Sequence, residues 1–256
     1  KILDILDILT GVRFTTSYTR IGGLALDMSD ECKARLIAFL DQFIPKLENA
    51  RNLIERNKIF INRCEGVGYI SKEDAMSLGV TGPNLRAAGV GNDLRVDDPY
   101  LKYRELDFNV PTATESDVLA RYYVRVREMY ETVKLLRQCL EKLPEGPINT
   151  PDAKQVLPDK GEVYSKMEEL IHDFMIVNFG NTPEKGVEAY QAIEAAKGEL
   201  GFYAISDGKG YPFRLKIRSP SFTNLGALPT MMKGAMISDI VAIIGSLDPV
   251  MGEADK

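Results

Sequence analysis

The sequence of 256 residues has no tryptophan, one histidine and three cysteines, and these shortages exclude several classes of protein. With His172 as its one imidazole, the chain lacks the ligands of most zinc sites and the base of a Ser-His-Asp triad. Cys32, Cys64 and Cys139 lie far apart and form no C-x-x-C pair. Such spacing is typical of reduced, buried thiols in a reducing compartment.

The sequence also lacks an excess of basic residues and a long apolar run. It has 37 acidic and 32 basic residues, a formal charge of -5 and a pI near 5.2, which argues against nucleic acid as a partner. The apolar run from Ile240 to Ile244 is far shorter than the ~18 residues of a membrane span. Lys1 opens what resembles the middle of an amphipathic helix, so we expect the sequence to begin inside a longer polypeptide.

Apolar residues make up 45% of the chain, and their seven-residue repeats predict long packed helices. One helix is expected over about 30–62, where Pro45 predicts a kink or a break. The clearest repeat predicts a helix over 114–143, and a further helix is expected near 163–174. The last, about 230–245, is apolar on most sides and is expected to be deeply buried.

Strand signals appear late in the chain. Alternating residues over 200–205 and 213–218 flank the turn at 207–210 and predict an antiparallel hairpin with one buried face. The expected fold is therefore mainly α with a small antiparallel β part. We predict a helical bundle over 1–185 and a region over 186–256 that holds the hairpin, a buried helix and a C-terminal tail, within one continuous domain.

The residues alone reveal little chemistry. His172 lacks a predictable partner, which favours a structural or surface role, and the glycine pairs of the chain lack the third glycine of a dinucleotide site. Arg121 and Arg125 lie one helical turn apart beside the apolar repeat, and so form either salt bridges on a solvated flank or part of a functional surface. Composition and spacing thus indicate a helix-rich subunit without a self-contained catalytic site.

Several longer blocks of sequence are more specific. In chain order they are Thr81-Gly82-Pro83 with Leu85-Arg86, Asp93-Leu94-Arg95, Ala120-Arg121-Tyr122 with Val124-Arg125 and Glu128-Met129, Lys197-Gly198-Glu199, Lys216-Ile217-Arg218 with Pro220-Ser221-Phe222, and Asp239 to Lys256. Together they closely resemble the D-type, or 49-kDa-type, subunit of respiratory complex I, a part of NADH:quinone oxidoreductase that is akin to the large subunit of nickel–iron hydrogenases. The resemblance covers essentially the whole chain and departs at Ala196, where the family usually has proline.

The hydrogenase kinship implies a long-helix bundle similar to that large subunit, with an altered metal site. Hydrogenases end in D-P-C-x-x-C-x-x-H, whereas this chain has Asp248-Pro249-Val250, then Glu253 and Lys256, at the same spacing. Valine is no metal ligand and one carboxylate cannot hold the cluster, so no metal is expected in this chain. The resemblance implies that the old metal cavity holds a quinone head group, lined here by Asp248, Val250 and Met251.

The resemblance also implies a function and partners. The chain would be a peripheral-arm subunit of a proton-translocating NADH:quinone oxidoreductase, inactive when isolated and without a cofactor of its own. Quinone, for instance ubiquinone, would be the substrate, and the electron donor would be the terminal iron–sulfur cluster of the neighbouring small B-type subunit. A C-type subunit would be a second partner. The expected location is the cytoplasmic face of the bacterial inner membrane, or the matrix side in mitochondria. Arg86, Arg95, Arg121 and Arg125 are candidates for the interface with the small subunit.

Other interpretations remain open at this point. A related subunit of a photosynthetic complex that takes electrons from ferredoxin would have a similar sequence, and a non-catalytic scaffold half is the simplest alternative. A membrane-bound hydrogenase is nearly excluded because no C-x-x-C pair is present. The histidine and tyrosine that bind the quinone head group in the family belong to an N-terminal portion outside this sequence. Asp248 has its own alternative, a turn residue that bonds backbone amides before Pro249.

Overall fold

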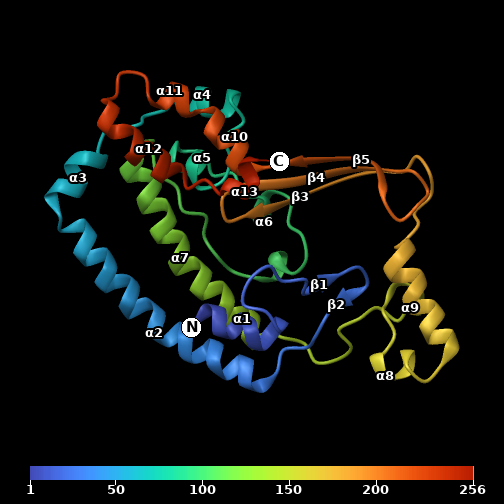
Figure 1. Ribbon diagram of the computed structural model, residues 1–256. Coiled ribbons are helices and arrows are strands. Elements are labelled where there is room, and N and C mark those ends of the chain that lie inside the picture. Colours follow the sequence, from blue (N-terminus) through green and yellow to red (C-terminus); the bar gives the residue numbers. More distant parts are fainter. Residues whose placement is uncertain (256) are drawn as a thin grey trace. The chain divides into compact units, whose positions relative to one another are not determined.

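A computed structural model describes residues 1–255, with the backbone alone at Ala153, and is about half helical with small antiparallel sheets (Figure 1). The expected mainly α chain with a small β part is therefore confirmed. The chain divides into two compact units, each described here by itself. Unit 1 comprises Lys1–Pro45, Leu140–Glu188 and Ala204–Leu215, and unit 2 comprises Lys46–Cys139, Ala189–Tyr203 and the segment from Lys216 onward. The boundary expected after residue 185 stays a prediction.

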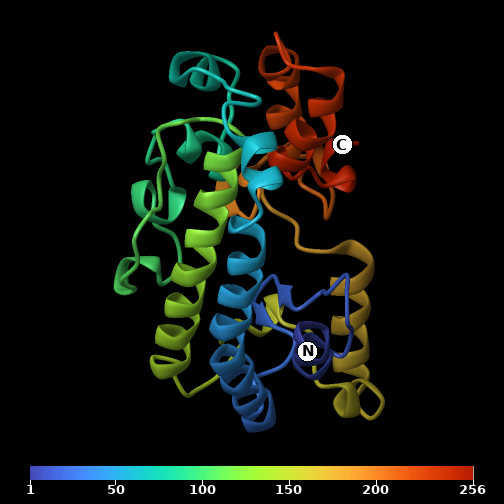
Figure 2. The same ribbon diagram turned by 90° about the vertical axis from the view of Figure 1, so that its left-hand side faces the viewer.

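Unit 1 holds short elements around its termini. They are α1 (Ile2–Thr10), β1 (Thr19–Arg20), β2 (Gly23–Leu24), a 3-10 turn η2 (Ala153–Gln155), α8 (Lys160–Val163) and α9 (Met167–Phe179). Figure 2 shows α8 and α9 in succession. Strands β1 and β2 pair antiparallel and were not expected from the sequence. A residue outside this strand pair stabilises it, because the side-chain oxygen of Asn149 accepts a hydrogen bond from the Leu24 amide at 3.2 Å.

Unit 2 holds most of the remaining helices. They are α3 (Lys58–Cys64), α4 (Lys72–Ser77), α5 (Pro83–Ala87), α6 (Leu94–Asp97), η1 (Tyr103–Glu105), α7 (Val118–Glu141, whose last residues belong to unit 1), α10 (Pro220–Gly226), α11 (Leu228–Met231), η3 (Ile237–Asp239), α12 (Ile240–Leu247) and α13 (Met251–Ala254). Besides α7, two parts of the fold have residues in both units. They are α2 (Asp30–Glu55) and a sheet of β3 (Glu188–Ala195), β4 (Gly198–Ser206) and β5 (Pro212–Arg218), in the order β3-β4-β5.

The first long helix ends earlier than expected and continues through its proline. Helix α2 contains Pro45 without a break, at the loss of one backbone hydrogen bond. The chain breaks instead before α3, where the Asn57 side chain caps the new helix by accepting the amides of Ile59 and Phe60 at 2.9 and 3.4 Å. Of the kink or break expected at Pro45, the break was therefore wrong, and the kink stays a prediction.

Helix α7 confirms the clearest sequence prediction and begins a turn later than expected. Asp117 caps it, since its carboxylate accepts the Ala120 amide at 2.7 Å. Val126 and Val133 of the apolar repeat are buried, whereas Met129 is 41% exposed. The face of α7 that carries Val126 and Val133 therefore packs inward, while Met129 lies nearer the surface.

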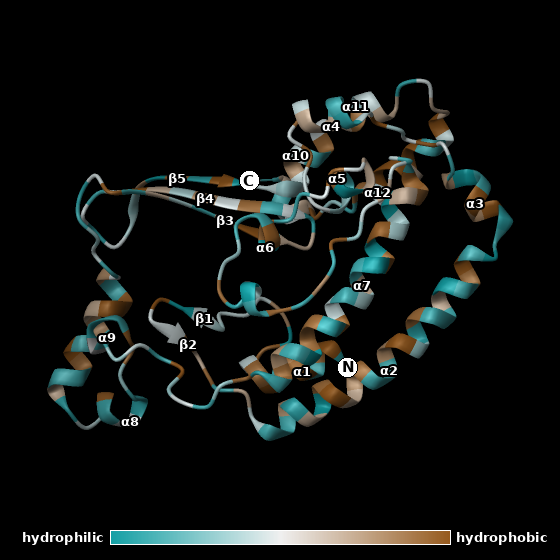
Figure 3. Cartoon of the chain, turned by 180° about the vertical axis from the view of Figure 1, so that it is seen from behind, coloured by the Kyte–Doolittle hydropathy of each residue, from teal (hydrophilic) through white to brown (hydrophobic). Residues whose placement is uncertain are grey.

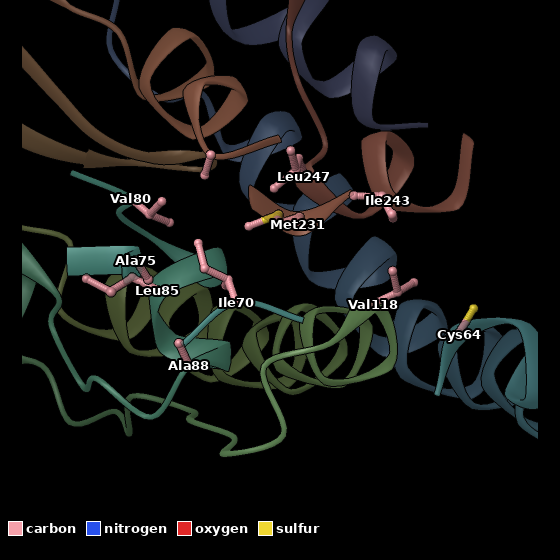
Figure 4. Packing of buried hydrophobic residues seen from close by; sticks show 11 residues of the cluster. Cys64, Ile70, Ala75, Val80, Leu85, Ala88, Val118, Met231, Ile243 and Leu247 are labelled. Carbon is pink, nitrogen blue, oxygen red and sulfur yellow. The ribbon is translucent and has the colours of Figure 1, made fainter. Parts of the chain in front are cut away.

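The core of unit 2 joins segments distant in sequence. Helices α3 to α5, the start of α7 and the C-terminal helices meet in one cluster of buried side chains (Figure 4). It contains Cys64, Ile70, Ala75, Val80, Leu85, Ala88, Val118, Ala227, Met231, Ile243 and Leu247. Each large aliphatic side chain buried here contributes roughly 1.5–3 kcal/mol. This core fixes the end of α12 against α5 and α7.

The C-terminal apolar segment differs from the expected buried helix. Over 230–245 the chain forms the end of α11, then η3 and α12, in place of one helix. Ile243 is fully buried, but Ile237 is 87% and Val241 79% exposed. Deep burial on most sides was wrong because only one side of α12 meets the core. Within residues 1–255, no helix has the length and apolarity needed to cross a membrane.

The hairpin expected from the sequence is present as β4 and β5, and β3 adds a strand that the sequence did not reveal. Its expected buried face is wrong in β5. Phe213 and Leu215, which alternate as a core face would, are 73% and 51% exposed, and Phe202 in β4 is 41% exposed. Alternation indicates two different faces, but burial also needs a covering layer.

Candidate functional site

A pocket of about 310 Å³ in unit 2 gathers Arg86, Arg95, Arg125 and Asp248, which are four of the five charged residues proposed from the sequence as site residues. Helices α5 and α7, the turn between β3 and β4 and the end of α12 contribute its walls. Its lining comprises Arg86, Arg95, Arg125, Glu128, Met129, Thr132, Glu194, Ala195, Ala196, Lys197 and Asp248. The volume is at the lower end of the range for small-molecule sites in proteins.

A close backbone approach places Lys197 at this pocket. A Cβ atom on Gly82 would lie 2.4 Å from the Gly198 Cα, and both glycines have positive φ, 69° and 137°. Only glycine permits this approach. The contact is fixed by Asn224, whose oxygen accepts the Thr81 amide and whose nitrogen donates to the Lys197 carbonyl, both at 3.1 Å.

Asp248 lies at the pocket where α12 ends. Its backbone is left-handed, with φ 54° and ψ 53°, a conformation that Asp and Asn adopt more readily than most residues. Its carboxylate accepts a hydrogen bond from the Lys197 ammonium and lies 3.9 Å from Nε of Arg125. The Asp248 side chain is 45% exposed, so the ion pair of Asp248 and Lys197 is accessible to solvent and to a ligand.

Arg125 is held between α5 and α12 with one donor unused. It donates to the side-chain oxygen of Asn84 at 3.0 Å and to the Arg121 carbonyl at 3.2 Å, and Asn84 in turn donates to the Leu247 carbonyl at 3.3 Å. Its Nε is buried and has no hydrogen-bond partner within residues 1–255. Burial lowers the pKa of this guanidinium, and the Asp248 and Glu128 carboxylates oppose that shift.

Arg86 forms the centre of a second charged cluster, in the wall of the pocket. The side chain is 2% exposed and donates to Glu128 and Glu194, each at 2.8 Å, and to the Asn92 carbonyl at 3.0 Å. Asp93 lies 3.7 Å away. Burial alone would lower the pKa of Arg86, but the surrounding carboxylates outweigh it and raise the pKa. The cluster links α5, α7 and β3.

Asp93 and Arg95 complete that cluster at its outer side. Arg95 donates two side-chain hydrogen bonds to the fully buried Asp93 carboxylate, at 3.0 and 2.6 Å, and its guanidinium lies 5.0 Å from the ring centre of Phe108. Burial opposes ionisation of Asp93, but the hydrogen bonds and charge of Arg95 outweigh it and hold the pKa of the carboxyl below its usual value.

Glu128 shows the opposite behaviour. Burial raises the pKa of its carboxyl, and the attraction of Arg86 and Arg125 only partly offsets this. Glu128 lines the pocket together with both arginines. A carboxyl with a raised pKa beside a pocket is suited to accept and release a proton.

Arg121 is a buried cation that forms no salt bridge with a carboxylate among residues 1–255. The side chain is fully buried and donates to the Ser246 hydroxyl at 2.9 Å and to the carbonyls of Gly68 and Ser116 at 2.9 and 3.2 Å. Burial, aided by Arg125, lowers its pKa to about 10. Its hydrogen bonds join α7 to α12 and to the loop before α4, so its position serves the architecture of the pocket.

The C-terminal tail lies beside the pocket and is held by α10. The Val250 amide donates to the Ser221 hydroxyl at 3.1 Å, and that hydroxyl donates to Glu253 at 2.6 Å. Val250 is 41% and Met251 62% exposed, and neither is among the described residues that line the pocket. Lys256, the last position of the hydrogenase-like spacing, lies outside the described residues.

The structure thus brings Asp248, Arg86, Arg95 and Arg125 to one pocket, whereas Arg121 lies behind it. The interface role expected for Arg86 and Arg121 stays a prediction, and would have to act through groups that these buried side chains hold. Sequence reasoning missed Lys197, Glu128, Glu194 and Asp93 as site residues. Lys197 and Glu128 stood in the quoted blocks, but Glu194 lies 108 residues from its partner Arg86.

His172, which the sequence left without a predictable partner, lies in unit 1. Its Nε2 lies 3.1 Å from the Val156 carbonyl oxygen, so the imidazole donates a hydrogen bond to the backbone. In the part of the chain that the structure describes, no three His, Cys, Asp or Glu side chains converge as metal ligands do.

Comparison with known proteins identifies a family. The sequence profile of a family described as "Respiratory-chain NADH dehydrogenase, 49 Kd subunit" matches residues 1–256. A D-type subunit of the NADH-quinone oxidoreductase of Chloroherpeton thalassium is 58% identical over 256 residues, which are 100% of this chain and 58% of that protein. The corresponding D-type subunits of Salinibacter ruber and Methylacidiphilum infernorum are each 50% identical over all of this chain, which covers 57% and 61% of them. The chain therefore spans about three-fifths of the length of these relatives.

Proposed function

Since this chain belongs to the family of the 49 kDa subunit of respiratory-chain NADH dehydrogenase, we propose that its pocket forms part of the quinone-binding cavity of an NADH:quinone oxidoreductase. The relatives are D-type subunits of that oxidoreductase, and in this proposal the chain belongs to a subunit of the same kind of complex. The proposal concerns where quinone binds and what this chain contributes there.

The observation that carries the proposal is the charged group at the end of α12. Lys197, Arg125 and Asp248 come from three elements and face one pocket, with the Arg125 Nε–H unpaired in the described residues. A quinone carbonyl oxygen accepts hydrogen bonds, and both cations can donate them. Reduction to the quinol consumes two electrons and two protons, so a donor beside the carbonyl oxygen is useful.

Asp248 has a proton-linked role in this proposal. Its carboxylate pairs with the Lys197 ammonium, and removal of the carboxylate charge would weaken that pair. Glu128, whose pKa burial raises, lies on the same pocket and is suited to pass protons to it. Val250 and Met251, exposed beside the pocket, would supply an apolar wall for the ring or the isoprenoid tail.

The remaining parts of the proposal follow the resemblance. The donor of electrons would be an iron–sulfur cluster on a B-type small subunit, with a C-type subunit as a further neighbour. Arg95 and Arg125 retain 17% and 18% side-chain exposure and are the accessible arginines for such an interface. The fold would be that of the hydrogenase large subunit, and the complex would lie on the cytoplasmic or matrix side of its membrane.

The test uses Asp248→Asn and Lys197→Met in the assembled oxidoreductase. Both variants should reduce NADH:quinone turnover by about tenfold or more, because each removes a positioned charge at the reacting oxygen. NADH oxidation by a water-soluble artificial acceptor should stay normal, since it tests only the upstream electron path. Normal quinone turnover in both variants would remove this pocket from the cavity.

Two alternatives give different results in the same preparation. A ferredoxin-dependent complex would reduce quinone with reduced ferredoxin and fail with NADH. A scaffold would show normal turnover in both variants and lose activity only when the complex falls apart.

A further inference from the structure

Helix α9 in unit 1 has its apolar residues on the outside. The residues that point outward at helical spacing form what we call the α9 stripe: Met167, Leu170, Ile171, Phe174 and Val177. Their exposed fractions run from 52% to 73%. Figure 3 shows the brown, hydrophobic stretches along α9. A surface helix that packs only against the core of its own unit would turn its apolar residues inward and its polar residues to solvent.

The other side of α9 is the anchored one. Glu169, His172 and Ile176 are partly buried, and the His172 imidazole donates to the Val156 carbonyl. The hairpin turn packs against the helix end so closely that a Cβ on Gly210 would meet the Phe179 carbonyl oxygen at 1.5 Å. The outward direction of the α9 stripe is therefore set by contacts within unit 1.

Carboxylates border the α9 stripe on both edges. At about 100° per residue, Glu168 lies between the exposed Met175 and Phe179 on one side of the stripe, and the partly buried Asp173 lies on the other side. The helix contains no lysine or arginine, and within residues 1–255 neither Glu168 nor Asp173 forms an ion pair. The surface is thus an apolar stripe with a carboxylate on each side and no lysine or arginine in the helix.

This pattern selects one kind of partner. Two copies of the stripe would bring negative edges together, and like charges across an interface disfavour binding. A lipid surface favours helices with lysine and arginine at their polar edges, which α9 lacks. We infer that the α9 stripe docks a segment of another polypeptide whose apolar residues are bordered by lysine or arginine. This inference goes beyond the quinone proposal, because α9 belongs to unit 1 and the pocket to unit 2.

A photoreactive amino acid at Val177, in cells that make the complete protein, tests the inference. The expected cross-link joins a different polypeptide at a segment in which lysine or arginine borders apolar residues. The same probe at Val187, which is 48% exposed outside α9, should not give that product. A product with lipid, with a second copy, with the same chain or with a segment that lacks basic residues would overturn the inference, as would no product at all.

Substitutions sharpen the same experiment. Phe174→Asp should reduce the Val177 cross-link about tenfold or more, because a charge replaces a central apolar contact. Phe14→Asp, at a 77% exposed phenylalanine elsewhere in unit 1, is the matched control and should change nothing. If Phe174→Asp fails to fold, the charge reversals Glu168→Lys and Asp173→Lys give the answer: a lower yield supports the inference, and an unchanged or higher yield overturns it. NADH:quinone activity in the same cells reports separately on the proposed function.

Discussion

Two charged clusters of unit 2 differ in how far their hydrogen bonds are satisfied. Around Arg86, the buried guanidinium meets Glu128 and Glu194 at 2.8 Å. Around Arg125, one buried N–H is unpaired within the described residues, and the facing Asp248 carboxylate is 45% exposed. The cluster around Arg86, which we call the closed cluster, holds segments of the chain together. The cluster around Arg125, which we call the open cluster, retains a hydrogen-bond donor for a ligand. Binding sites hold groups with unused hydrogen-bonding capacity in place through neighbours whose own hydrogen bonds are already formed.

The largest effect is expected from opening the closed cluster. Arg86→Met should lower the free energy of unfolding by about 3–5 kcal/mol, because Glu128 and Glu194 would stay buried without their cation. Urea denaturation measures the change, with the exposed Arg104→Met as the control. Equal midpoints for the two variants would show that the cluster is not structural.

Arg121→Met should have the next largest effect. Its loss leaves the carbonyls of Gly68 and Ser116 buried without their donors, at a cost of about 1–3 kcal/mol. The loss should be smaller than for Arg86→Met, since none of the described carboxylates forms a salt bridge with Arg121. Thermal unfolding of the two variants side by side gives the order, and a reversed order would contradict it.

Acid should weaken the closed cluster through Asp93. The pKa of Asp93 in the folded chain lies below the ordinary 3.8. Between these two pKa values the unfolded chain binds more protons, so the free energy of unfolding decreases as the pH is lowered. The contribution is present above pH 3.8 and is lost as the pH falls through the folded pKa. Asp93→Asn should therefore lose less stability than the parent on acidification from pH 5. An identical acid slope in both proteins would refute this assignment.

The smallest stability effect is expected in the open cluster. Asp248→Asn should change the free energy of unfolding by less than about 1 kcal/mol, because the ion pair is partly exposed and asparagine also tolerates the left-handed backbone. Denaturation of the purified chain is the measurement. A loss as large as that of Arg86→Met would make Asp248 a structural residue, as its turn alternative holds.

Local patterns in the sequence predicted where helices and strands form better than they predicted which of their residues are buried. The repeat of α7 was readable because helical spacing is a property of one segment. The exposure of Val241 and Phe213 was not, since apolar residues are buried only where another layer covers them. Pro45 was misjudged because packing can sustain a helix past the loss of one hydrogen bond.

The site could be predicted only as far as its sequence blocks reached. Asp248 and Arg125 were found by resemblance, because they stand in continuous motifs. Glu194 could not be found, because its role depends on a partner 108 residues away. Lys197 does stand in a continuous motif, but its place at the pocket depends on the approach of Gly198 to Gly82, which the motif does not reveal. Pairing across such distances is set by the packed chain and leaves no local signal.

The most direct test of the quinone proposal is photolabelling of the assembled oxidoreductase with a photoreactive quinone analogue. If the pocket is part of the cavity, the label should lie on the peptides that contain 193–199 or 244–252, and excess unlabelled quinone should prevent it. Label confined to other peptides, or label on these peptides that quinone does not displace, would contradict the proposal.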